Sequence, residues 1–222
     1  MGIGLTYKRG RLTLSPRASS VEVDNEFAAR LGNYKIEAAS FGGHFQLANQ
    51  RRLTGSLGRT RLSFEGHKNS NNTLSHSGSL GYEMALAKAY LLNARAFSQD
   101  IDSFQNRDLD KKMAGLSLSL RMGLKLGHFI TVSGSYSESH YDHVYSQSYH
   151  PTNQTPADGT KREDEMSTLG VSYLLLGSAV SPRLNNLFFN AGYSHSDTQS
   201  NIVGFGQKRD IGNLSANYIL RF

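Results

Sequence analysis

The sequence predicts an all-β protein, an antiparallel up-and-down transmembrane β-barrel, and three observations lead to this prediction. Apolar and polar residues alternate along most of the chain, and the connections between the alternating segments are short and long in turn. Only 38% of the 222 residues are hydrophobic, and the mean hydropathy is −0.44, which is low for a soluble domain with a packed core. A barrel with lipid outside and water inside needs no such core.

The clearest alternating segment is AGLSLSLRMGLKLGH, which begins at Ala114. Its apolar residues share one face of a strand, and its polar residues share the other. The polar face carries Ser117, Ser119, Arg121 and Lys125. The segment is longer than a typical globular strand and suffices for a tilted membrane crossing of about 9 to 11 residues. Because a cation on the lipid face costs about 2 to 4 kcal/mol at the bilayer midplane, we expect Arg121 and Lys125 to point into the lumen.

The same alternation recurs in other segments and sets the expected strand number. Eleven candidate strands can be distinguished, beginning with GIGLTYK and RLTLSPRAS. Joining these two would leave ten, and one missed strand would give twelve, so we expect about 10 to 12 strands, an even number being usual. They would form one domain, residues 1–222, which could also be part of a larger protein or barrel. In IEAASFGGHFQLA and LTGSLGRTRLSF the phase changes near Ser40 and Gly58, which indicates a β-bulge there.

The connections between the segments differ in length in a regular way. Short connections are expected at 48–52, 87–89, 127–128 and 181–183. Longer polar ones are expected at 67–72, 103–111, about 143–165 and 198–208. Short periplasmic turns at one end and longer extracellular loops at the other are typical of an outer-membrane barrel. No stretch approaches the 18 to 20 or so apolar residues that a transmembrane helix needs.

The alternation continues to the last residue of LSANYILRF. This ending resembles the C-terminal signal by which bacterial outer-membrane proteins are handed to the barrel-assembly machinery. The residues that match it are Leu214, Tyr218, Leu220 and Phe222. The resemblance implies a location in the bacterial outer membrane.

A narrower resemblance covers the last quarter of the chain, beginning with REDEMSTLGVSYLLLG. The features that carry it are Arg162 and Asp164, the 185–193 strand, Ser200, Asn201 and Ile202, and Arg209. These resemble the final hairpins of the barrel domain of surface lipoprotein assembly modifiers, the Slam family. The resemblance implies a translocon that helps to export proteins or lipoproteins to the cell surface, with a client protein and a periplasmic helical-repeat domain as partners. The chain departs from that family in lacking a helical-repeat domain and in having a shorter barrel.

The alternative function is a small pore with anion preference, or a plugged barrel that acts through its loops. The residues expected to line the lumen are Lys35, Glu37, Glu83, Arg95, Arg121, Lys125 and Arg221. Because most of them are cations, an open pathway would favour anions. The same charges could instead pair with Glu37, Glu83 and one another as a plug.

The sequence gives little support to an enzyme, a cofactor protein or a metalloprotein. No G-x-S-x-G motif occurs, and there is no cysteine. In HYDH, alternation would place His140 and Asp142 on one face and His143 on the other, so we expect no metal site and no catalytic residue. The net charge of +6 is spread without a basic stripe, which argues against nucleic acid and favours outer-membrane lipid and lipopolysaccharide as partners.

Overall fold

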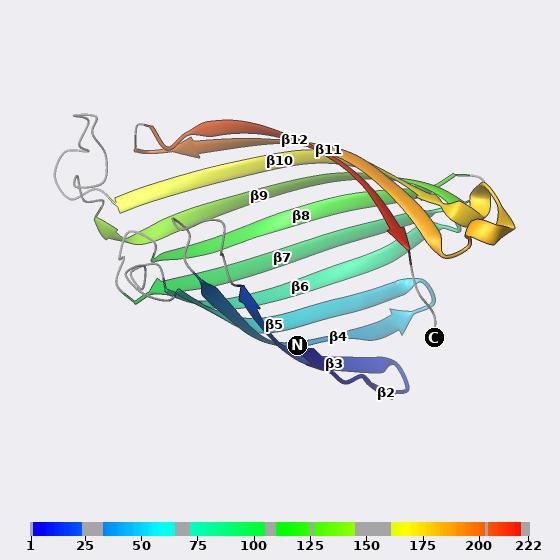
Figure 1. Ribbon diagram of the computed structural model, residues 1–222, viewed down its shortest axis with the longest axis horizontal. Helices are drawn as coiled ribbons and strands as arrows, with labels where there is room; N and C mark the ends of the chain where they lie inside the picture. Colours follow the sequence, from blue (N-terminus) through cyan, green and yellow to red (C-terminus); the bar gives the residue numbers. More distant parts are fainter. Residues whose placement is uncertain are drawn as a thin grey trace.

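The computed structural model describes residues 2–23, 33–64, 72–104, 110–124, 127–144, 161–202 and 204–218 (Figure 1). In these residues the chain is built from strands and two short 3₁₀ turns, Gly177–Ala179 and Pro182–Leu184. The strands are β1 (Gly2–Gly4), β2 (Tyr7–Arg9), β3 (Leu12–Val23), β4 (Tyr34–Ala48), β5 (Arg51–Phe64), β6 (Thr73–Ala87), β7 (Tyr90–Ser103), β8 (Lys111–Gly123), β9 (His128–Val144), β10 (Lys161–Leu176), β11 (Leu187–Ser200) and β12 (Gln207–Tyr218). Among the described residues, no helix is long and apolar enough to cross a membrane.

All the strands belong to one antiparallel sheet in which each strand from β3 to β12 pairs with the next along the chain (Figure 1). This confirms the predicted up-and-down arrangement. β4 and β5, like β6 and β7, are separated by two residues, so these hairpins close in tight turns. We call the end of the sheet with these turns the turn end. The connection between β9 and β10 lies at the opposite, loop end because the strands alternate in direction. The connection between β10 and β11 departs from the expected short turn at 181–183: it lies at the turn end, spans ten residues, 177–186, and holds both 3₁₀ turns.

The first two strands form one interrupted edge strand. β1 and β2 both pair with β3, on the side opposite β4, and the Leu5 amide donates to the Pro16 carbonyl at 3.0 Å between them. Gly10, with a φ of +56°, turns the chain from β2 into β3. The segments GIGLTYK and RLTLSPRAS are therefore two separate crossings. Counted separately the strands are twelve, and with β1 and β2 as one edge strand they are eleven; both numbers lie within the expected range.

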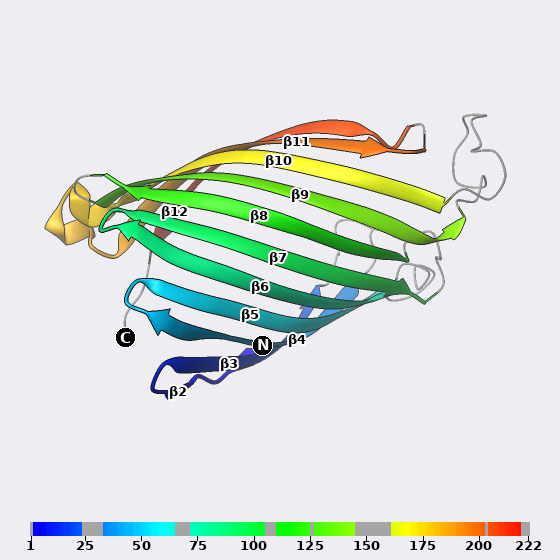
Figure 2. The ribbon, with the colours of Figure 1, turned by 180° about the vertical axis from the view of Figure 1, so that it is seen from behind.

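The two faces of the sheet differ in chemistry because directly paired residues share a face. The apolar face includes Leu57, Leu80, Leu116 and Leu169, whose exposed fractions lie between 64% and 69%. The polar face includes Glu83, Ser137, Ser139 and Asp164, all less than 9% exposed. The sheet is curved (Figures 1 and 2), and curvature crowds the side chains of the concave face. The described residues hold little apolar core, since Tyr141 and Ile202 are their only buried hydrophobic side chains.

The bulge expected near Ser40 and Gly58 is absent. These two residues pair directly, and β4 and β5 stay in register up to Gln46, where a shift occurs beside the turn. The apolar face that carries Phe41 and Leu57 therefore also carries Glu37, which pairs with Arg61. Lys35 lies on this same face. The expectation that Lys35 and Glu37 line the lumen rested on a change of phase, and the unbroken register places them on the apolar face instead.

The two edges of the sheet run in the same direction. β1 and β2 are antiparallel to β3, and ten strands from β3 to β12 alternate, so both the β1–β2 edge and β12 run from the loop end to the turn end. Within the described residues the two edges do not pair. Direct pairing would be parallel. A barrel that is antiparallel throughout therefore requires an odd number of further strands between β12 and β1.

This requirement predicts which cysteine pairs can be cross-linked in the membrane. Asn190 and Ser215 are directly opposed on the polar face of β11 and β12, so the pair Asn190→Cys with Ser215→Cys should form a disulfide readily. The pair Gly4→Cys with Asn213→Cys should not form a disulfide, because at least one intervening strand would separate their backbones by roughly 10 Å or more. Non-reducing gel mobility of the membrane protein measures both. Efficient disulfide formation between Gly4→Cys and Asn213→Cys would contradict the need for intervening strands.

Candidate functional site

The polar face is lined by small hydroxyl side chains that bond to one another across the strands. The hydroxyls of Ser56 and Ser79 lie 2.7 Å apart. The Gln99 amide donates to the Ser75 hydroxyl at 2.7 Å, and the hydroxyls of Thr168 and Ser196 lie 3.0 Å apart. These short side chains present hydrogen-bonding groups while filling little of the space above the sheet, as the wall of an aqueous path requires.

The polar face also carries arginines, some paired with an acid and some not. Arg52 forms an ion pair with Glu83, with two hydrogen bonds between guanidinium and carboxylate. Arg95 pairs in register with Gly81 and Ser117, so it lies on the same face as Glu83. Arg121 also lies on this face, with its guanidinium 4.2 Å from the centre of the Phe129 ring. In the described part of the chain neither Arg95 nor Arg121 has an ion pair with an acid.

The other residues predicted from the sequence fall into two groups. Leu214 and Tyr218 lie on the apolar face of β12, with exposed fractions of 86% and 61%. Lys125, Leu220, Arg221 and Phe222 lie outside the described residues. Lys35 and Glu37, on the apolar face, form an ion pair with each other at 2.8 Å. Of the predicted lumen residues, the structure therefore places Glu83, Arg95 and Arg121 on the polar face.

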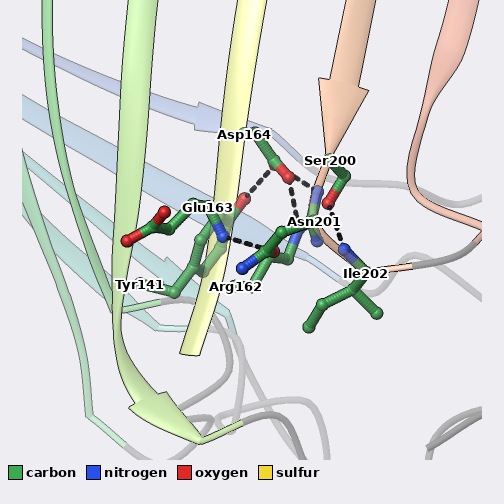
Figure 3. Close-up of polar contacts among 7 residues, drawn as sticks. All are labelled: Tyr141, Arg162, Glu163, Asp164, Ser200, Asn201 and Ile202. Atoms are coloured by element: carbon green, nitrogen blue, oxygen red, sulfur yellow. Dashed lines mark hydrogen bonds and ion pairs between the residues drawn. The ribbon is translucent and has the colours of Figure 1, made fainter. Parts of the chain in front are cut away.

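A second cluster lies at the loop end of the polar face and is centred on Arg162 (Figure 3). The register between β9 and β10 shifts between Lys161 and Glu163, and Arg162 lies at this irregularity. Its guanidinium donates to both carboxylate oxygens of Asp164, at 2.9 and 2.5 Å. The same guanidinium lies between two rings, 4.5 Å from that of Tyr141 and 3.7 Å from that of Phe205. The Tyr141 hydroxyl donates to Asp164 at 3.3 Å, which closes the cluster.

Asn201 fastens the connection between β11 and β12 to the start of β10 (Figure 3). Its side chain accepts from the Glu163 amide and donates to the Lys161 carbonyl, each at 2.8 Å. Its own amide donates to the Glu163 carbonyl at 3.1 Å. Next to it, the Ile202 amide donates to the Ser200 hydroxyl at 3.2 Å, and the Ile202 side chain is only 2% exposed. The connection is therefore held against the end of the polar face.

Lys111 adds a positive charge to this cluster. It pairs in register with Tyr141, and its ammonium lies 5.4 Å from the centre of that ring. The Lys111 ammonium and the Arg162 guanidinium both lie over the Tyr141 ring. The cluster therefore holds two cations and the carboxylate of Asp164, and it carries a net positive charge.

The residues of this cluster were only partly indicated by the sequence. Arg162, Asp164, Ser200, Asn201 and Ile202 were singled out by resemblance, and the structure brings them together. Lys111 and Tyr141 were not singled out. The sequence did contain one indication for Tyr141: it continues the alternation of Ser137 and Ser139, which places it on the polar face. Within the described ranges, no group of three His, Asp or Glu side chains could hold a metal ion.

The fold is that of bacterial outer-membrane β-barrels. A variant of OmpT, an outer membrane protein of Vibrio cholerae, matches 98% of this chain with a TM-score of 0.59 and 11% sequence identity. The siderophore receptor PirA of Acinetobacter baumannii matches 99% of the chain with a TM-score of 0.50 and 11% identity. The chain spans 62% of the OmpT variant and 38% of PirA. No protein-family model matches the sequence, and no curated protein does.

The Arg162 cluster predicts a local stability change. Asp164→Asn should lower the free energy of unfolding by about 1 to 3 kcal/mol, because it leaves the half-buried Arg162 without its carboxylate. The gel-shift assay that separates folded from unfolded barrel, run across a urea series, measures this. The control is Asp197→Asn, whose carboxylate is 3.6 Å from the largely exposed Lys208 ammonium and should matter little. Equal midpoints for the two variants would show that the cluster does not stabilise the loop end.

Proposed function

We propose that this chain forms most of the wall of a bacterial outer-membrane barrel whose lumen conducts anionic solutes. The polar face would line the lumen, the apolar face would contact lipid, and the loop end would face the outside of the cell. The exposed leucines of the apolar face support this orientation, because their burial in lipid would remove a large apolar surface from water.

One observation carries the anion preference: the polar face bears more cations than acids. Its acids within the described strands are Glu83 and Asp164, and each already pairs with an arginine. Arg95 and Arg121 have no acidic partner in these strands. Their positive electrostatic field therefore acts on the solutes that enter the lumen. A lumen lined by arginine and small hydroxyl groups concentrates anions and repels cations. The plug of internally paired charges is less well supported, because few acids are available to pair.

Export of proteins or lipoproteins to the cell surface is the second candidate. One observation favours it: residues that carry the Slam resemblance lie together at the loop end. There Asn201 and Arg162 hold the connection between β11 and β12 in place. A fastened loop at the outer mouth would shape an exit for a client chain.

The pore is tested by conductance. The protein extracted from outer membranes and placed in a planar bilayer under a salt gradient should give a reversal potential of the sign expected for anions. Arg95→Gln combined with Arg121→Gln should reduce the anion-to-cation permeability ratio by about twofold to fivefold, because two fixed charges are lost from the wall. Lys112→Gln removes a cation from the apolar face and should leave the ratio unchanged. Cation selectivity in the wild type, or no change in the double variant, would contradict the proposal.

Lys111 adds to this selectivity from the loop end of the polar face. Because Lys111→Met removes one fixed positive charge from the wall, it should lower the anion-to-cation permeability ratio below that of the wild type. Reversal potentials under the same salt gradient measure this, with Lys112→Gln on the apolar face as the control. An unchanged ratio in Lys111→Met would show that its charge does not act on ions in the lumen.

Export is tested in cells. If the second candidate holds, Asn201→Ala, which loosens the last connection, should reduce the set of lipoproteins that protease can reach on whole cells. Mass spectrometry of the released peptides measures this set, with barrel abundance as the control. The strain should carry the variant as its only copy of the protein, at the same barrel abundance as the wild type. An unchanged set of exposed lipoproteins in that strain would exclude a role of this connection in export.

A further inference from the structure

A shallow groove runs along the apolar face at the edge formed by β1, β3, β4 and β5. Two adjoining depressions, of about 670 and 620 Å³, share Ile3, Ala18, Ala39 and Arg59. Ala18 and Ala39 pair directly, and their small side chains form the floor. Phe41, Leu57 and Leu5 flank the first depression and are 48%, 66% and 70% exposed. The groove is therefore a largely apolar surface depression that is open to the medium around this face of the sheet.

Two arginines lie at the loop-end limit of this groove. Along β5 the apolar face carries Leu53 and Leu57, then Arg59 and Arg61. Arg59 has Ala39 on one side and His76 on the other, so neither cross-strand neighbour is acidic. The Arg61 guanidinium lies 5.6 Å from the centre of the Phe104 ring. None of the ion pairs among the described residues involves either arginine, and both side chains are exposed.

Glu37 lies directly opposite Arg61, and its charge is balanced by Lys35. The Lys35 ammonium lies 2.8 Å from its carboxylate. The loop-end part of the groove is lined by Glu37, Arg59 and Arg61, and beside it Lys35 and Glu22 lie opposite each other on the same face. These five side chains together carry a net positive charge.

We propose that this groove binds a phosphorylated lipid of the outer leaflet, with an acyl chain along Ala18 and Ala39 and a lipid phosphate on Arg59 and Arg61. Arginine matches phosphate through paired hydrogen bonds, and its alkyl stem can lie along an apolar surface while the guanidinium reaches the headgroup layer. The site depends on the proposed orientation of the apolar face toward lipid. It does not depend on whether the lumen conducts.

The charges elsewhere on the apolar face explain why the lipid would bind at this groove and not over β9 and β10. On β9 and β10, Glu138 lies directly opposite Glu165, and Glu163 lies opposite His140. Lipid phosphates would be repelled there. The basic section over β4 and β5 and the acidic section over β9 and β10 would therefore fix which side of the barrel holds the lipid.

The test uses the protein extracted from outer membranes in detergent and lipid A as the probe. Native mass spectrometry during a titration gives the apparent affinity for bis-phosphorylated lipid A and for its dephosphorylated form. The wild type should bind the phosphorylated form about tenfold more tightly. Arg59→Gln combined with Arg61→Gln should abolish this difference, whereas Lys112→Gln, which removes a cation paired with Asp142 on the same face, should preserve it. Ala39→Leu, which fills the floor of the groove, should weaken binding of both forms.

Three results would overturn the proposal. The first is equal binding of phosphorylated and dephosphorylated lipid by the wild type, a comparison that needs no variant. The second is an unchanged affinity in the double arginine variant, with folding verified by its gel mobility before and after heating. The third is displacement of lipid A by millimolar inorganic phosphate, which would mean that the arginines form a site for free phosphate. Because none of these measurements involves ion flow, a failure here is distinct from a failure of the proposed pore.

Discussion

The antiparallel register from β3 to β12, continuous along the middle of every strand, is the constraint on which the rest of the structure depends. Successive side chains of a strand point to opposite faces, so one continuous ladder of backbone hydrogen bonds assigns every strand residue to the apolar or the polar face. The register shifts lie near strand ends, at Gln46, Ala85 and Lys161. A shift in mid-strand would have moved leucines to the polar face and arginines to the apolar one.

This ladder also explains how a chain with so little apolar core can form an ordered sheet. The backbone groups of each inner strand are satisfied by its two neighbours, which is the condition for crossing a membrane. The ladder ends at two edges that run in the same direction. In the described residues the outer backbone groups of these two edges have no partner strand, and an antiparallel closure between them takes an odd number of strands.

Much of the fold could be predicted from the sequence because alternation is a local property. The 114–122 part of β8 alternates strictly, and its two faces could be assigned residue by residue. The assignment failed for Lys35 and Glu37 because their strand carries charges at one end of the same face that is apolar at the other. The Arg162 cluster could not be predicted as a geometry, since it joins β8, β9, β10 and the last connection, and their contacts depend on long-range register.

The assignment of the two faces is the central claim, and site-directed spin labelling of the protein in lipid bilayers tests it most directly. Nitroxides placed one at a time along 114–122 report collisions with oxygen, which is concentrated in lipid, and with a water-soluble nickel complex. The account predicts a period of two, with oxygen collisions highest at Leu116, Leu118 and Leu120 and nickel collisions highest at Ser117, Ser119 and Arg121. Labels at Leu57 and Phe41 should follow the leucines. An aperiodic or inverted profile would contradict the two-faced wall.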